Sequence, residues 1–346
     1  MSVKFGIIGA GNISRFHFNG LEKAGAPITH IADLNETAAK PWADKFGAKY
    51  SKDYRTLIDD KNVDAVAILV HSRFHKEIAL AALNAGKDII CEKTMMDNAD
   101  EAAEVSMKVK RSKILFFTAF MKRFFPAAQK AKEILPSLGR IFSANVRSYQ
   151  PWGDLFNLET GANHEWIMKN YGGAIVKCAG SHMLDMMLWL LGRPKNVYAN
   201  IDTIPGSKID RKAAAIFEYD NGATAAFETA AHPLNKVGLE RLGWDEYIEV
   251  NGTNGRLTFT SVVWDKPERH APILTHYDNK TGTTAEYRFD IVNPFDNEMK
   301  YFHDCIEKRV QGMSDVIDGF NVDAVIGAMF DSAKGKAPVT VDWRGL

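Results

Sequence analysis

The chain has 346 residues, of which 46% are hydrophobic and 25% are charged, and its 43 Lys and Arg residues balance 43 Asp and Glu residues. This length predicts two domains, and a net charge of zero gives no general attraction for nucleic acid or for an anionic membrane surface. The cysteines Cys91, Cys178 and Cys305 are widely spaced, so they indicate neither a disulfide framework nor a zinc site. With a strand expected from Val3 and only short apolar runs, we expect a cytoplasmic protein without a leader or a membrane span.

The first 120 residues alternate short apolar strands with amphipathic helical stretches. This alternation predicts an α/β domain of the Rossmann type, with a doubly wound parallel sheet and helices on both faces. The expected strands are Phe5–Ile8, Ile28–Ala32, Ala65–Val70, Asp88–Cys91 and Ile114–Thr118; the expected helices are Asn12–Gly20, Glu36–Phe46, Lys76–Ala85 and Ala99–Arg111.

The pattern changes after Pro126. A helix at Ala127–Leu135 is followed by strand-like stretches joined by turns such as Asn221-Gly222, which predict hairpins. The expected strands are Ile141–Tyr149, Asn196–Ile201, Ala213–Tyr219, Ala223–Thr229, Tyr247–Val250 and Arg256–Thr260, and two helices, Asn297–Val310 and Gly319–Ala333, close the chain. We therefore predict an α/β domain over 1–122 and an α+β domain over 123–346 with a largely antiparallel open sheet. Such a sheet leaves one face to be covered, so a homodimer or homotetramer is expected.

A glycine-rich turn follows the first strand, in the order Gly9-x-Gly11-x-x-Ser14. Gly11 has no Cβ, so the backbone can approach a pyrophosphate closely, and a helix N-terminus beyond it favours negative charge. This turn predicts a dinucleotide-binding domain over 1–122, which leaves 123–346 as the substrate domain. We expect Gly9, Gly11, Asn12 and Ile13 to contact the dinucleotide cofactor. The second strand ends at Asp33, about 20 residues beyond the loop, where a carboxylate can accept both ribose hydroxyls and would repel a 2′-phosphate. Because no Lys or Arg follows at 34–36, NAD is favoured over NADP.

Ligands of doubly wound sheets bind at the carboxyl ends of the strands. Two segments of the first domain are expected there: His71 to His75, and Cys91-Glu92-Lys93-Thr94. His71, His75, Glu92 and Lys93 are therefore further candidates for cofactor contact. A third segment belongs to the second domain and runs from Gly172-Gly173-Ala174 through Lys177-Cys178-Ala179-Gly180-Ser181-His182 to Asp185.

The glycine loop, the Glu-Lys pair after a later strand and the glycine-rich segment ending in His-x-x-Asp together resemble the Gfo/Idh/MocA oxidoreductases. The resemblance extends over nearly the whole chain and includes Met121 to Pro126 and the closing helix near Gly319. It implies oxidation or reduction of a carbinol of a sugar, sugar nucleotide or cyclitol with NAD(H) or NADP(H). Glu92-Lys93 matches the Glu-Lys-Pro motif of the family, with Thr94 in place of proline.

The resemblance also implies two catalytic residues. Lys93 is the residue expected to hydrogen-bond the reacting oxygen, and an ammonium suits a developing alkoxide. His182 is the expected general base, since a neutral imidazole can accept the hydroxyl proton. The alternatives are a solvated lysine at a strand end and a histidine that caps a helix. Asp185 is interpreted as structural.

Cys178 departs from the family pattern, because many members carry an aspartate at this position that binds substrate hydroxyls or orients the histidine. A neutral thiol is a poor substitute for a carboxylate, and a small apolar filler is the favoured interpretation of Cys178 over a reactive thiol. For Arg123, a substrate contact and a pair with a carboxylate between the domains are equally expected; for the aromatic residues the alternative is core packing. The candidate substrate-binding residues are Arg123, Trp152, His164, Trp166, Lys177 and Cys178.

The leading hypothesis is an NAD-dependent dehydrogenase acting on a sugar or cyclitol. Two alternatives use the same fold: an enzyme that cleaves glycosidic bonds while recycling bound NAD, and a regulator that senses NAD or a sugar without turnover. No ligand set in the sequence suggests a metal.

Overall fold

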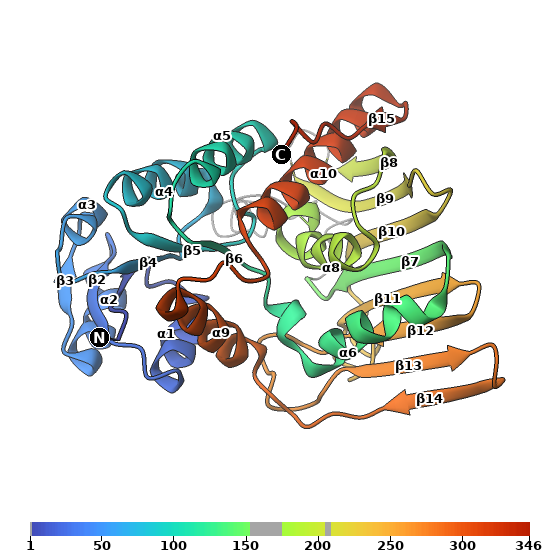
Figure 1. Cartoon of the computed structure of the whole chain (residues 1–346), viewed down its shortest axis with the longest axis horizontal. Coiled ribbons are helices and arrows are strands. Elements are labelled where there is room, and N and C mark those ends of the chain that lie inside the picture. The colour runs from blue at the N-terminus through green and yellow to red at the C-terminus, as the bar shows by residue number, and fades with distance from the viewer. Residues whose placement is uncertain (1, 153–174, 205–208) are drawn as a thin grey trace. The chain divides into compact units, whose positions relative to one another are not determined.

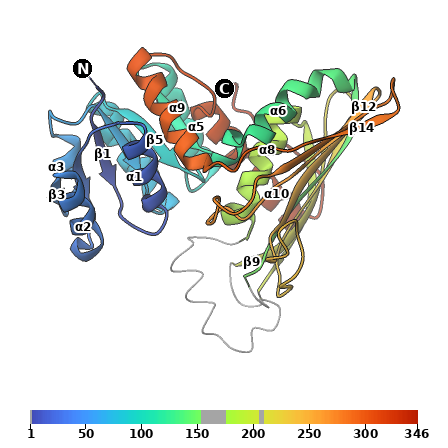
Figure 2. The ribbon, with the colours of Figure 1, turned by 90° about the horizontal axis from the view of Figure 1, so that it is seen from below.

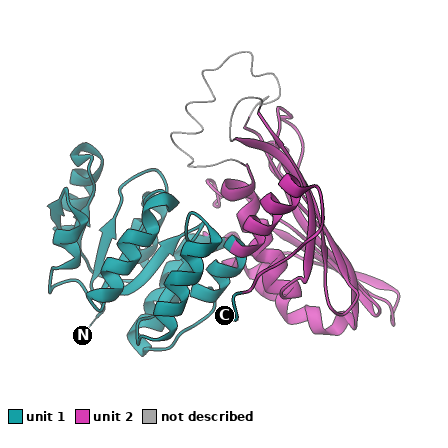
Figure 3. Ribbon diagram, turned by 90° about the horizontal axis from the view of Figure 1, so that it is seen from above, with its two compact units in different colours: residues 1–121, 294–323, 344–346 teal, residues 122–293, 324–343 magenta. Residues whose placement is uncertain are grey.

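The computed structural model describes residues 2–152, 175–204 and 209–346, which form two compact units (Figures 1 and 3). Unit 1 comprises Met1–Met121, Pro294–Asp323 and Arg344–Leu346, and unit 2 comprises Lys122–Asn293 and Ala324–Trp343. The boundary expected near residue 122 marks the point where the chain first passes from unit 1 to unit 2. The chain later returns to unit 1, because the segment 294–323 belongs to that unit.

Unit 1 is built on a six-stranded parallel sheet in the order β3-β2-β1-β4-β5-β6. The strands β1, β4 and β6 are entirely buried and mostly apolar, as strands covered on both faces must be. The strands are β1 (Phe5–Ile8), β2 (Ile28–Ala32), β3 (Lys49–Ser51), β4 (Ala65–Ile68), β5 (Asp88–Glu92) and β6 (Phe116–Ala119). The predicted Rossmann-type sheet is thus confirmed, and β3 is a strand that the sequence analysis missed.

Helices cover both faces of this sheet, with α1 and α9 on one side and α4 and α5 on the other (Figure 1). The helices of unit 1 are α1 (Ser14–Lys23), α2 (Glu36–Phe46), α3 (Tyr54–Ile58), α4 (His75–Asn84), α5 (Ala99–Lys110), α9 (Pro294–Lys308) and the beginning of α10 (Val316–Gly335). Helix α9 packs closely on α1, since the rings of Phe16 and Phe295 stack with centroids 4.6 Å apart. A Cβ on Gly20 would lie 2.8 Å from the Met299 side chain, so the missing side chain allows this close approach.

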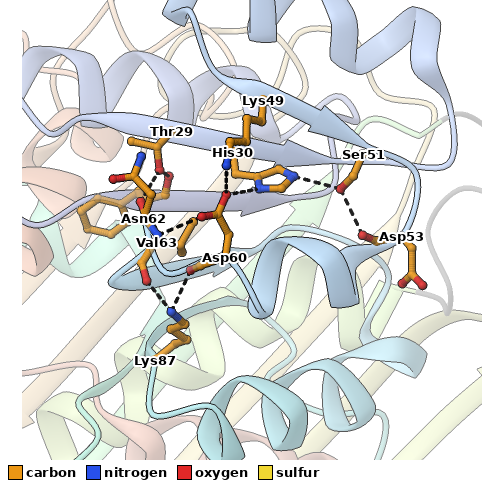
Figure 4. A network of polar contacts seen from close by, with 10 residues as sticks. Thr29, His30, Lys49, Ser51, Asp53, Asp60, Asn62, Val63 and Lys87 are labelled. Carbon is orange, nitrogen blue, oxygen red and sulfur yellow. Dashed lines mark hydrogen bonds and ion pairs between the residues drawn. The ribbon is translucent and has the colours of Figure 1, made fainter.

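A polar network ties β2 and β3 to the loop before β4 (Figure 4). Asp60 Oδ2 lies 3.0 Å from His30 Nδ1 and accepts a 2.9 Å hydrogen bond from Lys49 Nζ, while its Oδ1 accepts the Asn62 N–H. Lys87 Nζ donates to the backbone oxygen of Asp60. The hydrogen bonds from Lys49 and Asn62 hold the pKa of Asp60 well below its usual range, although burial opposes this shift.

Unit 2 contains a nine-stranded mixed sheet in the order β14-β13-β12-β11-β7-β10-β9-β8-β15. Only β7 and β10 pair in parallel and the other neighbours are antiparallel, so the predicted largely antiparallel sheet is confirmed. The strands are β7 (Ile141–Gln150), β8 (Asn196–Thr203), β9 (Asp210–Glu218), β10 (Thr224–Ala231), β11 (Asp245–Gly252), β12 (Gly255–Thr260), β13 (Ile273–Asp278), β14 (Thr283–Tyr287) and β15 (Val339–Thr340). The last three were not expected; β14 is mostly exposed and so lacks the apolar alternation of a half-buried strand.

Helices α6 (Pro126–Ile134) and α8 (Ser181–Leu191) lie on one face of this sheet (Figure 2). Alternate residues of β9 and β10, such as Phe217 and Phe227, face these helices and are fully buried. Residues between them, such as Ile216, lie on the opposite face and are exposed. The alternation follows from the two-residue period of a strand and places one apolar core between the sheet and its helices.

Candidate functional site

The two glycines of the glycine loop in unit 1 lie in different surroundings. Gly9 has φ +103°, and a Cβ there would lie 2.6 Å from the Leu69 carbonyl oxygen, so only glycine fits. Gly11 is different, because a Cβ built on it meets nothing within 4 Å and the backbone faces open space. Ser14 closes the turn by donating its hydroxyl to the Gly11 carbonyl at 2.5 Å. The exposed backbone at Gly11 and Asn12 can approach a phosphate as the first turn of α1 begins.

Asp33, at the end of β2, is tied directly to this loop. Its Oδ2 accepts a 2.6 Å hydrogen bond from the Ala10 N–H, and its Oδ1 accepts one of 2.7 Å from the Asn35 N–H. The side chain is half-buried, and each carboxylate oxygen has a second lone pair. The carboxylate is therefore held beside the glycine loop with acceptor capacity left for the hydroxyls of a ribose. The next residue, Leu34, is 85% exposed.

The segment after β5 carries Lys93, which is half-buried and joined to Thr94 by a cis peptide bond. Glu92 precedes it and is buried, with Oε1 2.7 Å from His17 Nε2 and Oε2 accepting the Lys93 backbone N–H at 3.0 Å. Burial raises the pKa of Glu92, but its contacts with His17 and Lys93 outweigh this and leave the pKa below its usual value. Glu92 is thus a buried carboxylate that supports the loop, and the expected cofactor contact does not suit it.

His71 and His75 follow β4 but lie in different surroundings. His71 is half-buried, and burial together with the charge of Arg73 lowers its pKa. His75 is fully buried, with Nδ1 3.1 and 3.0 Å from the carbonyl oxygens of Thr94 and Met95 and Nε2 2.9 Å from that of Val70. Burial lowers the pKa of His75 despite these carbonyl contacts. The cofactor contact expected from His75 does not fit, because both ring nitrogens face backbone oxygens inside the unit.

In unit 2, Val176–Gly180 form a π-helical turn that continues directly into α8. From 175 to 188 every residue is buried except Lys177, Cys178 and His182, which are partly exposed. The buried residues pack tightly on the sheet, since a Cβ on Gly180 would lie 3.2 Å from the Phe227 ring. The structure therefore brings three sequence-predicted residues to the accessible surface of one otherwise buried helical segment.

Asp210, at the start of β9, supports the beginning of this segment and was missed by the sequence analysis. Its side chain is buried, and Oδ2 accepts the Val176 N–H at 2.7 Å. Burial raises the pKa of Asp210 to about 6, although the Val176 hydrogen bond and the charge of Lys177 oppose this. Acid residues are too common for a sequence pattern to have singled out one that lies 34 positions from its partner.

Arg123 takes part in a buried ion pair, which is one of the two interpretations that the sequence left open. Its Nε and Nη2 donate to the two oxygens of Asp185 at 2.9 and 2.6 Å, and both side chains are 1% exposed. The pair forms inside unit 2, so the expected carboxylate partner exists but does not lie between domains. Its neighbour Lys122 is equally buried and donates to Glu246 and to Ser261. These side chains hold the segment with which the chain enters unit 2, and they are too deeply buried to offer a surface to a ligand.

Trp152 is half-buried and lies just beyond β7. His164 and Trp166, the other expected pocket residues, lie outside the described residues. Among the residues that the structure describes, no group of three or more His, Cys, Asp or Glu side chains is arranged to hold a metal ion. No helix within 2–152, 175–204 and 209–346 is long and apolar enough to cross a membrane.

Comparison with known proteins finds a family model for each of two parts of the chain. Residues 3–120 match the family model described as "Oxidoreductase family, NAD-binding Rossmann fold", and residues 128–258 match "GFO/IDH/MocA C-terminal domain". The chain is 26% identical to D-xylose 1-dehydrogenase (NADP(+)) 2 of Haloferax volcanii, over 98% of this chain and 99% of that protein. It is 24% identical to scyllo-inositol 2-dehydrogenase (NAD(+)) of Bacillus subtilis, over 98% and 96% of the two chains.

A third relative, levoglucosan dehydrogenase of Pseudarthrobacter phenanthrenivorans, is 28% identical over 75% of this chain and 73% of its own. Among solved structures, a levoglucosan dehydrogenase in complex with NADH and levoglucosan has a TM-score of 0.85 at 22% identity, covering 99% of this chain and 100% of that one. At this identity the structural likeness establishes the fold.

Proposed function

The chain belongs to the Gfo/Idh/MocA family of oxidoreductases, and from this premise we propose that it transfers a hydride between NAD(H) and a secondary alcohol or ketone of a sugar, sugar derivative or cyclitol. It is an NAD-dependent oxidoreductase of a family whose named relatives are dehydrogenases. The observation that carries the proposal is the position of Lys93 at the carboxyl end of β5, in the same parallel sheet whose first strand ends in the glycine loop.

The residues of unit 1 fit the dinucleotide. The open backbone at Gly11 can receive its pyrophosphate, and the carboxylate of Asp33 can accept hydrogen bonds from a ribose. When bound, NAD supplies an acceptor for the hydride that leaves the substrate carbon. A 2′-phosphate would meet the negative charge of Asp33 and no Lys or Arg at 34–36, which supports NAD over NADP.

The chain itself supplies the groups for the proton and the developing charge. The ammonium of Lys93 hydrogen-bonds the reacting oxygen and stabilises the alkoxide that develops on it. The imidazole of His182, on the accessible side of α8, accepts the hydroxyl proton during oxidation and returns it during reduction. The remaining candidates for contact with the sugar are Trp152, Lys177 and Cys178, together with His164 and Trp166, which lie outside the described residues.

The proposal is tested by following NADH formation with a panel of inositols, pentoses, hexoses and anhydrosugars. We expect turnover with at least one of them, a loss of about 10³-fold in kcat for Lys93→Met and a loss of at least about 10²-fold for His182→Asn. Lys76→Met is the control, because Lys76 forms only a surface ion pair with Glu104. Full activity of Lys93→Met would refute the assignment. Cleavage of a glycoside without net NADH would favour cofactor recycling instead, and NAD binding without any turnover would favour a sensor.

We also propose that the chain forms a homo-oligomer through the sheet face opposite α6 and α8. This proposal is supported by the large apolar side chains of Phe142, Tyr198 and Ile216, which are 46–48% exposed on strands β7, β8 and β9. A second copy of the same face would bury them. Light scattering of the purified protein checks the particle mass, and a monomer at micromolar concentration would contradict the proposal.

A further inference from the structure

A buried hydrogen-bonded pair joins helix α1 to the end of β5. His17 is completely buried, and its Nε2 lies 2.7 Å from Oε1 of Glu92, whose side chain is only 7% exposed. Because the pKa of Glu92 is lowered, despite the opposing effect of burial, its carboxylate is ionised near neutral pH and can only accept hydrogen bonds. His17 Nε2 therefore carries the proton that joins the two side chains.

The other oxygen of the same carboxylate reaches the main chain. Glu92 Oε2 accepts the backbone N–H of Lys93 at 3.0 Å, so one carboxylate connects the buried imidazole to the backbone of the proposed catalytic lysine. The imidazole is itself held in place, with Nδ1 3.3 Å from Met299 Sδ and its ring edge-on to Phe295 at a centroid distance of 5.9 Å.

A second buried histidine holds the residues that follow. His75 Nδ1 lies within 3.1 Å of the carbonyl oxygens of Thr94 and Met95, and its Nε2 faces Val70. The main chain on the C-terminal side of Lys93 is thereby connected to the β4–α4 loop. Both flanks of Lys93 are anchored inside unit 1, while the Lys93 side chain retains partial exposure.

We propose that His17 and Glu92 are positioning residues, which fix the backbone of Lys93 and thereby hold its ammonium where the reacting oxygen binds. This inference rests on the proposed function of Lys93. Burying the Glu92 carboxylate costs desolvation energy, and an apolar side chain of similar volume would fill the same space. What the carboxylate adds, held in place by His17, is a directed hydrogen bond to one backbone N–H. A displacement of about 1 Å at a catalytic group can cost about 10²-fold in rate, which is the scale on which such an anchor acts.

The experiment compares His17→Phe, which keeps a flat ring but has no donor, with His17→Gln, whose amide can still donate to Glu92. We expect kcat to fall by about 30- to 100-fold in His17→Phe with the KM for NAD nearly unchanged, and to stay within about fivefold of wild type in His17→Gln. Hydrogen exchange of the Lys93 amide in the cofactor-free protein is the second measurement, and it should accelerate at least tenfold in His17→Phe only. His30→Phe is the matched control, because His30 is also a buried histidine of unit 1 beside a carboxylate, that of Asp60.

These measurements separate the inference from the function on which it rests. If Lys93→Met is fully active but the Lys93 amide responds to His17→Phe, the proposed function fails and the anchoring is real. If His17→Phe leaves both kcat and amide exchange at wild-type values, or if His17→Gln and His30→Phe lower kcat equally, the positioning role is refuted. Should His17→Phe fail to fold, Glu92→Met answers the same question, since a thioether of similar length removes both acceptor oxygens; unchanged kcat and exchange in that variant would also refute the role.

Discussion

The two units hold their candidate site residues in opposite ways. In unit 1, Asp33 and Glu92 are each hydrogen-bonded to backbone N–H groups, and the segment after Lys93 is bonded to a buried histidine. In unit 2, Lys177, Cys178 and His182 point outward from a helical segment whose other residues are buried. A change in unit 1 thus alters the backbone that binds the cofactor, whereas a change on the accessible side of α8 can leave the packing intact. This contrast suits a protein that keeps one cofactor and whose relatives act on different sugars.

After Lys93, the largest effect in unit 1 is expected at the Asp33 carboxylate. Replacing Asp33 by Ala removes the acceptor for ribose hydroxyls and releases the Ala10 N–H of the glycine loop. Hydrogen bonds to a charged group are worth about 1.5–3 kcal/mol each, so kcat/KM for NAD should fall at least about 10²-fold, while that for NADP falls less. Steady-state kinetics with both cofactors measure this difference. Glu36→Ala removes the same charge from an exposed position nearby and should leave the ratio unchanged; equal losses in both variants would contradict the role of Asp33.

The spacing of a few residues along the chain explains why an NAD-binding Rossmann fold could be predicted for unit 1 from the sequence. Gly9, Gly11 and Asp33 lie at the ends of two adjacent short strands, and the parallel sheet places these ends together. The pattern could not tell that His75 faces inward, because a histidine after a strand suits either environment. The sequence could not decide between the two interpretations of Arg123 for a similar reason. A long cationic side chain where the chain enters a domain can contact a ligand or pair with a buried acid such as Asp185.

The remaining misses concern contacts between residues far apart in sequence. His17 meets Glu92 across 75 residues, and α9 returns to α1 after almost the whole of unit 2. No periodicity encodes such contacts. The edge strand β14 and the two-residue β15 were missed because exposed or very short strands carry no apolar alternation.

The next effect in size contrasts a half-buried carboxylate of unit 1 with the buried carboxylate of Asp210 in unit 2. Burial raises its pKa to about 6 from 3.8, so between about pH 4 and 6 the folded state binds a proton that the unfolded state has lost. Stability then decreases as pH rises through this window, by about 3 kcal/mol in total. Asp210→Asn keeps an acceptor for the Val176 N–H without the charge and should stabilise this region above pH 7 while changing little below pH 4. Hydrogen exchange of α8 amides at pH 7.5, with pH-corrected intrinsic rates, measures the gain.

Asp60 in unit 1 should behave in the opposite sense (Figure 4). Hydrogen bonds from Lys49 and Asn62 lower its pKa, so its contribution to stability is complete above about pH 4 and is lost as pH falls further. Asp60→Asn should therefore destabilise β2 and β3 at pH 7, by about 2 kcal/mol, because Lys49 loses its charged partner. Exchange of β2 amides checks this value, with Asp59→Asn as an exposed control. A stabilised Asp60→Asn or a destabilised Asp210→Asn at pH 7.5 would contradict the electrostatic contrast between the units.

The smallest effect is expected at Cys178, a partly exposed residue of the π-helical turn in unit 2. Its thiol is half-buried at a position where the resemblance seen in the sequence implies an aspartate in many family members. A neutral sulfur can neither bind substrate hydroxyls strongly nor orient His182 as a carboxylate would. Serine has a similar size, so Cys178→Ser should change kcat/KM by less than about threefold and leave stability within about 1 kcal/mol. Cys305→Ser, at a half-buried thiol in unit 1, is the control for general effects of losing sulfur. A loss of about 10²-fold or more in kcat/KM at Cys178 alone would instead mean that the thiol takes part in the reaction. Activity would then depend on the exact side chain at Cys178 in unit 2 as strongly as it does at Asp33 in unit 1.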